Sequence, residues 1–190
     1  MSAAREVWIT GIGILSAAGD RAALHAPGSI ETNAPQDPVN ISGYPVLPPC
    51  AVDFSKQIPK VSEQRQMSRW QKIGVYAAGV ALDDAGLTGR EEFLERTHLL
   101  VAAGNGDRDC SLDSKILEGD SCERVLAAEF NESLLRGLRP TLYLGELSNL
   151  LAGNISIVHH VTGSSRTFKG EEIAGVSVVE NAYRRILADQ

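Results

Sequence analysis

The chain has 190 residues, of which 43% are hydrophobic and 22% charged, and its formal net charge is −6 at pH 7. This composition is typical of an ordinary globular protein and excludes a largely disordered or fibrous chain. The acidic balance, without a clustered basic footprint, argues against binding to nucleic acid.

The first apolar stretch, residues 7–15, predicts a buried strand that runs into a glycine turn. The stretch is too short to span a membrane and has no basic leader, so we expect a cytoplasmic protein. Gly11 and Gly13 form a GxG pattern, but Ser16 stands where a dinucleotide fingerprint needs its third glycine. The glycines therefore indicate a turn with positive φ or a close backbone approach, and no cofactor is expected.

Residues 27–59 hold seven of the eight prolines, interspersed with Ser, Asn, Asp and Gly. This composition predicts a long surface loop within a single domain that spans residues 1–190. The three cysteines form no CxxC pair and no zinc-ligand spacing, so we expect unpaired thiols and no metal; they are Cys50, Cys110 and Cys122.

The most regular helical pattern begins at Ser68, a typical N-cap residue, and ends at Gly86. Arg65, Arg69 and Lys72 form a local basic group here, which is typical of a solvated helix face. Residues 98–103 predict a second buried strand, followed by a turn at residues 104–106.

Further helical material is predicted over residues 112–135, and Pro140 suits the first turn of a helix that ends near Gly153. Residues 155–161 then predict a strand. The last predicted elements are an extended segment at 165–170 and a helix at 173–187, in which Glu180 and Arg184 form an i,i+4 pair. Strands that alternate with helices predict an α/β fold with a mostly parallel sheet.

Two polar clusters resemble metal sites only superficially. His159 and His160 are neighbours on a predicted strand, so their side chains point to opposite faces and do not converge on one ion. Asp107, Asp109 and Asp113 lack the glycine and the terminal glutamate of a calcium loop, which favours a solvated acidic turn.

Glu171 and Glu172 precede the last predicted helix. Carboxylates are favoured there by the helix dipole and the free backbone N–H groups. The same location also suits a reactive anion in an enzyme, so the residues alone leave both interpretations open.

Four stretches together resemble the ketoacyl synthase family of thiolase-like condensing enzymes, in the order and at the spacing of that family. They are residues 7–19 (VWITGIGILSAAG), 66–87 (QMSRWQKIGVYAAGVALDDAGL), 99–106, and 149–163 (NLLAGNISIVHHVTG). The resemblance implies an α/β, thiolase-like layered fold, in its N-terminal half only, with a mixed, mostly parallel sheet flanked by helices.

Counted on from Thr162 and Gly163, the nucleophilic cysteine of the family falls on Glu172, with Gly170 and Glu171 before it. This stretch resembles the chain-length-factor branch, in which the cysteine is replaced, commonly by glutamine. The catalytic histidines of the family belong to a second half that this sequence does not contain. The resemblance therefore implies no independent activity, since a carboxylate does not form the thioester that a cysteine makes.

The implied function is that of a non-catalytic subunit in a β-ketoacyl-acyl-carrier-protein synthase complex. It would pair as a heterodimer with a complete ketosynthase subunit, meet the acyl carrier protein through that complex, and shape the acyl tunnel with residues 107–138. The pathway would be of the type II polyketide, aryl polyene or fatty-acid-like kind. Two alternatives remain open: a malonyl-carrier-protein decarboxylase that uses Glu172 for priming, and a purely stabilising scaffold.

Overall fold

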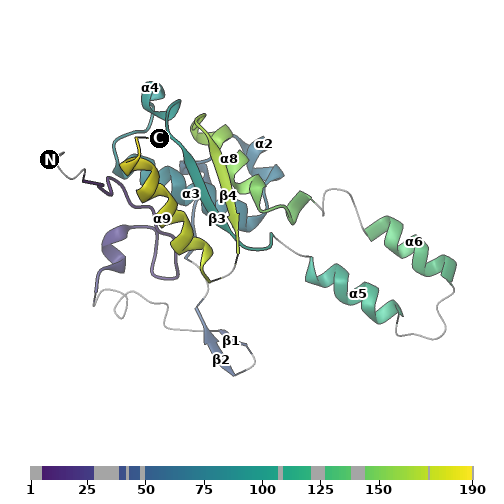
Figure 1. Cartoon of the computed structure of the whole chain (residues 1–190). Helices are drawn as coiled ribbons and strands as arrows, with labels where there is room; N and C mark the ends of the chain where they lie inside the picture. Colours follow the sequence, from purple (N-terminus) through teal and green to yellow (C-terminus); the bar gives the residue numbers. More distant parts are fainter. Residues whose placement is uncertain are drawn as a thin grey trace.

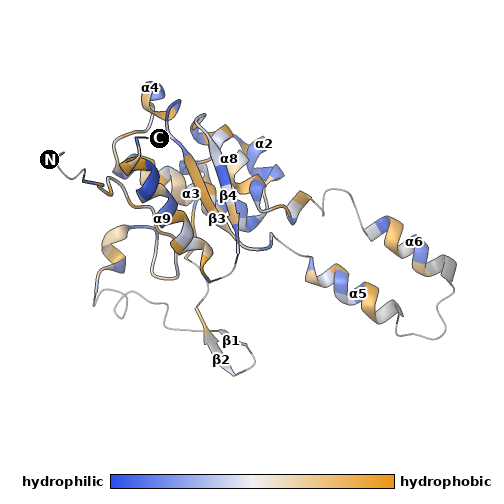
Figure 2. Cartoon of the chain, in the orientation of Figure 1, coloured by the Kyte–Doolittle hydropathy of each residue, from blue (hydrophilic) through white to orange (hydrophobic). Residues whose placement is uncertain are grey.

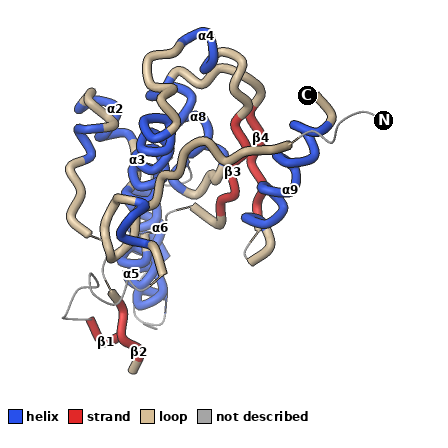
Figure 3. Tube along the Cα trace, turned by 90° about the vertical axis from the view of Figure 1, so that its left-hand side faces the viewer, coloured by secondary structure: helices blue, strands red, loops and turns tan. Residues whose placement is uncertain are grey.

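The computed structural model of the chain describes residues 6–27, 39–41, 43–47, 50–106, 109–120, 127–137, 144–170 and 172–189. Its body is a parallel pair of strands, β3 and β4, with α3 and α8 on one side and α9 on the other (Figure 1, Figure 3). The bounds are β3 Leu99–Ala103, β4 Ser165–Lys169, α3 Arg69–Asp84, α8 Asn149–His159 and α9 Ala174–Leu187. The prediction of a layered α/β fold with parallel strands and flanking helices is confirmed.

The hydrophobic core lies between the sheet and α8. Val101 and Ala103 share one face of β3, because alternate residues of a strand point the same way, and both are buried in a cluster with Leu151 and Ile155 of α8. Ile58 is fully enclosed in the same cluster. Figure 2 shows that β3 is hydrophobic along its length, whereas β4 is more hydrophilic. The sheet is therefore anchored to the body chiefly through β3.

Helix α3 has the two ends that its sequence predicts. The backbone N–H of Ser68 donates to Oε1 of Gln71 at 3.0 Å, which is one half of a capping box. At the other end Gly86 has φ of +67°, and the N–H of Leu87 returns to the carbonyl of Leu82 at 2.9 Å. This left-handed glycine closes the helix in a Schellman arrangement, where a side chain would be strained.

The prediction of a strand at residues 155–161 is wrong, because α8 continues to His159. A short apolar run does not by itself distinguish a strand from a buried helix. Here Ile155 lies one turn after Leu151, so both side chains reach the same core cluster from one helix face. The helix is capped by His160, whose φ of +57° is left-handed.

The prediction of a buried strand at residues 7–15 is also wrong. The structure assigns no strand to this segment, and the side chains of Trp8 and Ile9 are 75% and 83% exposed. Gly11 and Gly13 explain the path, because a Cβ on either would collide with backbone carbonyl groups of α3. Close backbone approach, one of the two predicted reasons for these glycines, is therefore what the structure shows.

Four other predicted elements are confirmed. The two expected strands are β3 and β4, and the expected last helix is α9, in which Arg184 donates to Glu180 at 2.6 Å. The helical material expected over residues 112–135 is a pair of helices, α5 Cys110–Asp120 and α6 Ala127–Gly137. These two contact each other and extend away from the body (Figure 1).

The remaining elements are short. Part of the proline-rich stretch forms an antiparallel hairpin instead of a continuous loop, and the rest of it lies partly outside the described residues. None of the helices in the described ranges has the length and apolar character needed to span a membrane. The short elements are η1 Ala22–His25, β1 Val39–Ile41, β2 Tyr44–Val46, η2 Phe54–Lys56, α2 Val61–Gln66 and α4 Glu91–Leu94.

Candidate functional site

The carboxyl ends of β3 and β4 meet at one edge of the sheet. The strands are parallel, and their last residues, Ala103 and Lys169, are paired in register. Residues 104–106 follow one strand, and residues 170–173 follow the other and lead into α9. In open α/β sheets ligands bind outside the carboxyl ends of the strands, so this edge is the first candidate for a functional site.

Glu172 lies in the turn between β4 and α9 and its side chain is exposed. It stands two residues before Ala174, the first residue of α9, and that first turn contains no other acid. The positive end of the helix dipole and the free N–H groups of the first turn favour a carboxylate there. Glu171 lies outside the described residues.

The backbone around Glu172 leaves room for side chains. A Cβ on Gly170 would lie 3.4 Å from the Cβ of Ala174, which is an ordinary contact, and a Cβ on Gly175 would meet no atom within 4 Å. Of the cysteines within the described ranges, Cys50 lies near the start of α3 and Cys110 begins α5. The turn therefore presents a carboxylate and no described thiol.

Helix α9 carries an apolar face that points to solvent. Val176 and Val179 are each 68% exposed and Tyr183 is 51% exposed. On the other side of the helix, Oδ1 of Asn181 and Nε of Arg185 are buried without a hydrogen-bond partner in the described structure. We call the exposed stripe the α9 apolar face; its members are Ile173, Val176, Val179, Tyr183 and Leu187.

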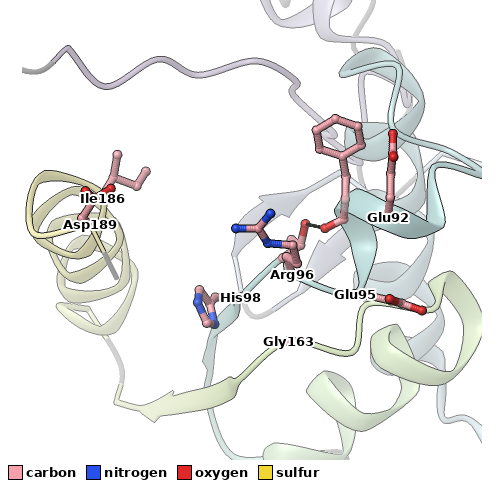
Figure 4. Close-up of a pocket in the computed structure, with 9 residues that line it drawn as sticks. Glu92, Glu95, Arg96, His98, Gly163, Ile186 and Asp189 are labelled. Carbon is pink, nitrogen blue, oxygen red and sulfur yellow. Dashed lines mark hydrogen bonds between the residues drawn. The ribbon is translucent and has the colours of Figure 1, made fainter.

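A cavity of about 840 Å³ lies at the opposite edge of the sheet from Glu172. His98 precedes β3 and Gly163 precedes β4, so this cavity flanks the amino ends of the strands (Figure 4). A strand of five residues is roughly 16 Å long, and the cavity therefore does not reach the turn that holds Glu172. This cavity and the turn with the candidate carboxylate therefore lie at opposite ends of the strands. The turn is the candidate site because it follows the carboxyl ends of the parallel strands.

Within this cavity the Arg96 side chain faces inward. Figure 4 shows the guanidinium of Arg96 directed toward α9, while the carboxylates of Glu92 and Glu95 point away. Nδ1 of His98 accepts a hydrogen bond from the backbone N–H of Ser164 at 3.2 Å, so a neutral ring carries its proton on Nε2. Sequence patterns did not indicate this cavity, since residues 92–98 line it together with Gly163 and the end of α9, which are distant in the sequence.

A second cavity, of about 540 Å³, lies beside the amino end of α3. Of the basic group in the sequence, Arg69 and Lys72 line this cavity, whereas Arg65 lies on α2 with an exposed side chain. Cys50 is also on its wall. Burial, and then the charge of Asp20, raise the pKa of the Cys50 thiol.

His159 and His160, which are adjacent in the sequence, have different environments. His159 ends α8, and its Nε2 lies 2.8 Å from the carbonyl oxygen of Val75 in α3. Burial lowers the pKa of His159 below its usual value. His160 is exposed in the left-handed cap, so the two rings do not face a common ion.

Of the acidic cluster in the sequence, Asp109 and Asp113 lie at the start of α5, where the N–H of Asp113 donates to the carbonyl of Asp109 at 3.0 Å. Oδ1 of Asp109 accepts a hydrogen bond from the N–H of Leu112 at 3.0 Å and so stabilises the start of α5. Asp113 belongs to α5, and Asp107 lies outside the described residues. Among the residues that the structure describes, no three His, Cys, Asp or Glu side chains come together as a metal site would need.

Comparison with known families gives a match over most of the chain. Residues 41–190 match the family described as "Beta-ketoacyl synthase, N-terminal domain". A comparison with curated proteins finds no match.

Two of the solved structures that share the fold serve as examples. One is a beta-ketoacyl synthase from Burkholderia phymatum STM815, with 18% sequence identity and a TM-score of 0.66 over 94% of this chain. The other is a chain of the AntDE:AntF complex, a type II PKS acyl-carrier protein in complex with its ketosynthase bound to the hexaketide, with 18% identity and a TM-score of 0.67 over 94% of this chain. The present chain spans 42% and 46% of the length of those two chains.

Proposed function

Since this chain belongs to the beta-ketoacyl synthase family, whose N-terminal domain it matches over residues 41–190, we propose that it is a non-catalytic, chain-length-factor-like subunit. In this proposal residues 1–190 form one domain, which pairs with a complete ketosynthase and shapes its acyl tunnel. The complex works on acyl groups held by a carrier protein in a type II polyketide, polyene or fatty-acid-like pathway.

The observation that carries this proposal is the exposed carboxylate of Glu172 in front of α9. By resemblance, this is the position of the family's cysteine nucleophile. A carboxylate that attacked an acyl thioester would give an anhydride and release a thiolate, and that product is far more reactive than the thioester it replaced. The position therefore fits a subunit that does not hold the growing chain itself.

The α9 apolar face supports the presence of a partner. Each Å² of apolar surface that leaves water contributes about 25 cal/mol, so a stripe of five large side chains favours association strongly. Obligate partners commonly bury 2,000 Å² or more in total.

The extended pair of helices supports a role in chain length. Leu117 of α5 and Leu135 of α6 are 66% and 82% exposed, although both side chains are large and apolar. Side chains of this kind would line the closed end of an acyl tunnel in the partner. The AntDE:AntF structure, in which a ketosynthase is bound to the hexaketide, is a precedent for a protein of this fold that holds a long acyl chain.

Co-expression with a ketosynthase tests the proposal. We expect the two chains to copurify as a heterodimer, observed by native mass spectrometry, and the product chain length to change when this chain is present. Leu117→Ala with Leu135→Ala should lengthen the product without loss of the complex. The proposal would be abandoned if the complex formed and the product spectrum were the same with and without this chain.

A second function, priming by decarboxylation of malonyl-carrier protein, is favoured only by the exposure of Glu172. Glu172→Ala separates the two functions. If this chain acts by shape, the variant complex makes the same products at the same rate. If Glu172 decarboxylates the malonyl group, acetyl-carrier protein, measured by mass spectrometry, accumulates with the natural sequence and not with the variant.

A further inference from the structure

The cavity beside the amino end of α3, which we call the α3 cavity, has features that neither the fold nor the proposed subunit role requires. Its volume of about 540 Å³ lies within the range of small-molecule sites. Its lining combines two cations with an apolar surface. Leu15 and Phe54 come from segments far apart in the sequence, so the chain assembles the cavity only when it folds.

Among the described residues that line the α3 cavity, the charged side chains are all positive. Arg69 and Lys72 both belong to the first turn of α3, which has no acidic residue. Cations at the amino end of a helix are destabilising, because the helix dipole is positive there. Within the described part of the chain neither side chain forms an ion pair or a hydrogen bond. An anion would therefore be stabilised by both cations and by the helix.

Two acidic side chains near the α3 cavity accept hydrogen bonds from other groups. Asp20, whose charge acts on Cys50, accepts a hydrogen bond from the hydroxyl of Tyr76 at 2.8 Å. Asp53 accepts one from the N–H of Ser55 at 3.0 Å. Among the described residues neither carboxylate forms an ion pair with Arg69 or Lys72.

The rest of the wall is apolar and held in place. Phe54 packs edge-on against Tyr76, with their ring centroids 6.0 Å apart. The N–H of Cys50 donates to the carbonyl of Ser16 at 3.2 Å, which ties the two segments on either side of the cavity. A wall that is already ordered loses little conformational freedom on binding. The apolar lining consists of Leu15, Val52, Phe54 and Ile73.

We propose that the α3 cavity binds a small amphipathic anion, with a carboxylate or phosphate head between Arg69 and Lys72 and an alkyl or acyl body against the apolar wall. A free acyl carboxylate and an alkyl phosphate share this chemistry. The site is separate from the turn that holds Glu172, and its existence does not depend on the proposed subunit role.

Cys50 reports occupancy of this cavity. In the full chain carrying Cys110→Ser and Cys122→Ser, we expect saturating octanoate or octyl phosphate to slow alkylation of Cys50 by iodoacetamide about tenfold. Octanol lacks the charge and inorganic phosphate lacks the apolar body, so neither should protect at the same concentration. Stronger protection by octanoate or by octyl phosphate identifies the preferred head group. Equal protection by octanol and octanoate would overturn the proposal, as would no protection by either anion.

Calorimetric titration of octanoate provides a readout that does not use the thiol. Arg69→Gln with Lys72→Gln should weaken binding about tenfold or more, because both charges of the site are lost. The matched variant Arg69→Lys with Lys72→Arg keeps both charges and should keep the affinity within a few fold. Unchanged affinity in the neutral variant overturns the proposal, and if that variant fails to fold, the comparison of octanoate with octanol on the natural sequence decides alone.

Discussion

Gly11 and Gly13 determine where the amino-terminal segment lies, since each sits against the backbone of α3. A Cβ on Gly13 would be 2.8 Å from the backbone nitrogen of Ala81, and one on Gly11 would be 2.8 Å from the Cβ of Ala85. Both would come closer still to a carbonyl oxygen of the helix. Backbone atoms within a helix do not move aside as a flexible side chain would, so these positions accept glycine alone.

We expect Gly13→Ala to lower the free energy of unfolding by about 1–3 kcal/mol, the usual cost of overpacking. Gly153→Ala is the matched control, because Gly153 lies in α8 with an exposed surface and no atom within 4 Å of a new Cβ. That control should gain about 0.5–1 kcal/mol from its higher helix propensity. Urea denaturation measures both, and equal stability of the two variants would contradict the close approach.

His159 shows how burial changes the chemistry of a single side chain. Burial lowers its pKa, while the contact with the carbonyl of Val75 and the charge of Asp83 act in the opposite direction. The ordinary pKa of 6.5 applies to the unfolded chain, and the folded value is lower. As pH falls below about 6.5 the unfolded state takes up the proton first, so stability decreases with acidification.

His159→Gln removes this titration and keeps a donor for the carbonyl of Val75. We expect the loss of stability between pH 7.5 and pH 5 to be smaller in the variant than in the natural chain. Denaturant unfolding at the two pH values measures the difference. The burial of a neutral His159 would be refuted by identical pH dependences.

Helix α9 differs from a usual surface helix because large apolar side chains lie on its exposed side. Its exposed stripe is apolar, whereas Asn181 and Arg185 contribute buried polar atoms on the side toward the sheet. A helix that covers a two-stranded sheet on one side and a partner on the other would bury both faces. The pattern is thus consistent with α9 as an internal helix of a larger assembly.

Val179→Lys tests this role of the α9 apolar face. Val179 is 68% exposed in the single chain, so its replacement should change the stability of that chain by no more than about 0.5 kcal/mol. In the complex the lysine would lie in an apolar interface, and we expect the affinity for the ketosynthase to fall at least about tenfold.

Glu180→Gln is the control on the adjacent residue. Glu180 is paired with Arg184 on the exposed side of the helix, and the loss of such a pair costs about 0.5 kcal/mol or less. Glu180 is beside Val176 and Tyr183, but Gln keeps the size of Glu and adds no charge, so this variant should bind the ketosynthase within a few fold of the natural chain. If Val179→Lys bound equally well in pull-down and calorimetry, the α9 apolar face would not be the interface.

Besides Leu117 and Leu135, exposed apolar side chains in the described part of the chain gather at the amino-terminal segment and along α9. Trp8 and Ile9 are the largest contributors to the first region. The described sheet has two strands, and a sheet of that size rarely forms an independent core. A partner that covers these surfaces would therefore contribute much of the stability.

We expect the unfolding temperature of the chain to rise with the concentration of added ketosynthase, as binding to the folded state alone requires. The chain by itself should bind a hydrophobic dye such as ANS, and the complex should bind less of it. Differential scanning fluorimetry and dye titration measure the two effects. An unfolding temperature independent of the partner would count against an obligate pairing.

The elements that could be predicted from the sequence are those with local signals at both ends. Ser68 and Gly86 mark α3 because capping and left-handed termination depend on neighbouring residues alone. The place of Glu172 before a helix could be predicted for the same reason. The structures of residues 7–15 and 155–161 could not be predicted in this way. A short apolar run does not show whether it will form a strand, a helix or an extended segment.

The cavities depend on contacts between distant segments. Leu15, Phe54 and Arg69 line one cavity, and Arg96 and Ile186 line the other, although no spacing in the sequence relates them. Their meeting is decided by the packing of loops on α3 and of α9 on the sheet. Helix caps and turns could therefore be predicted from the sequence, because they depend on neighbouring residues. The cavities could not, because they depend on packing between distant segments, and the free energy of that packing belongs to no single segment of the chain.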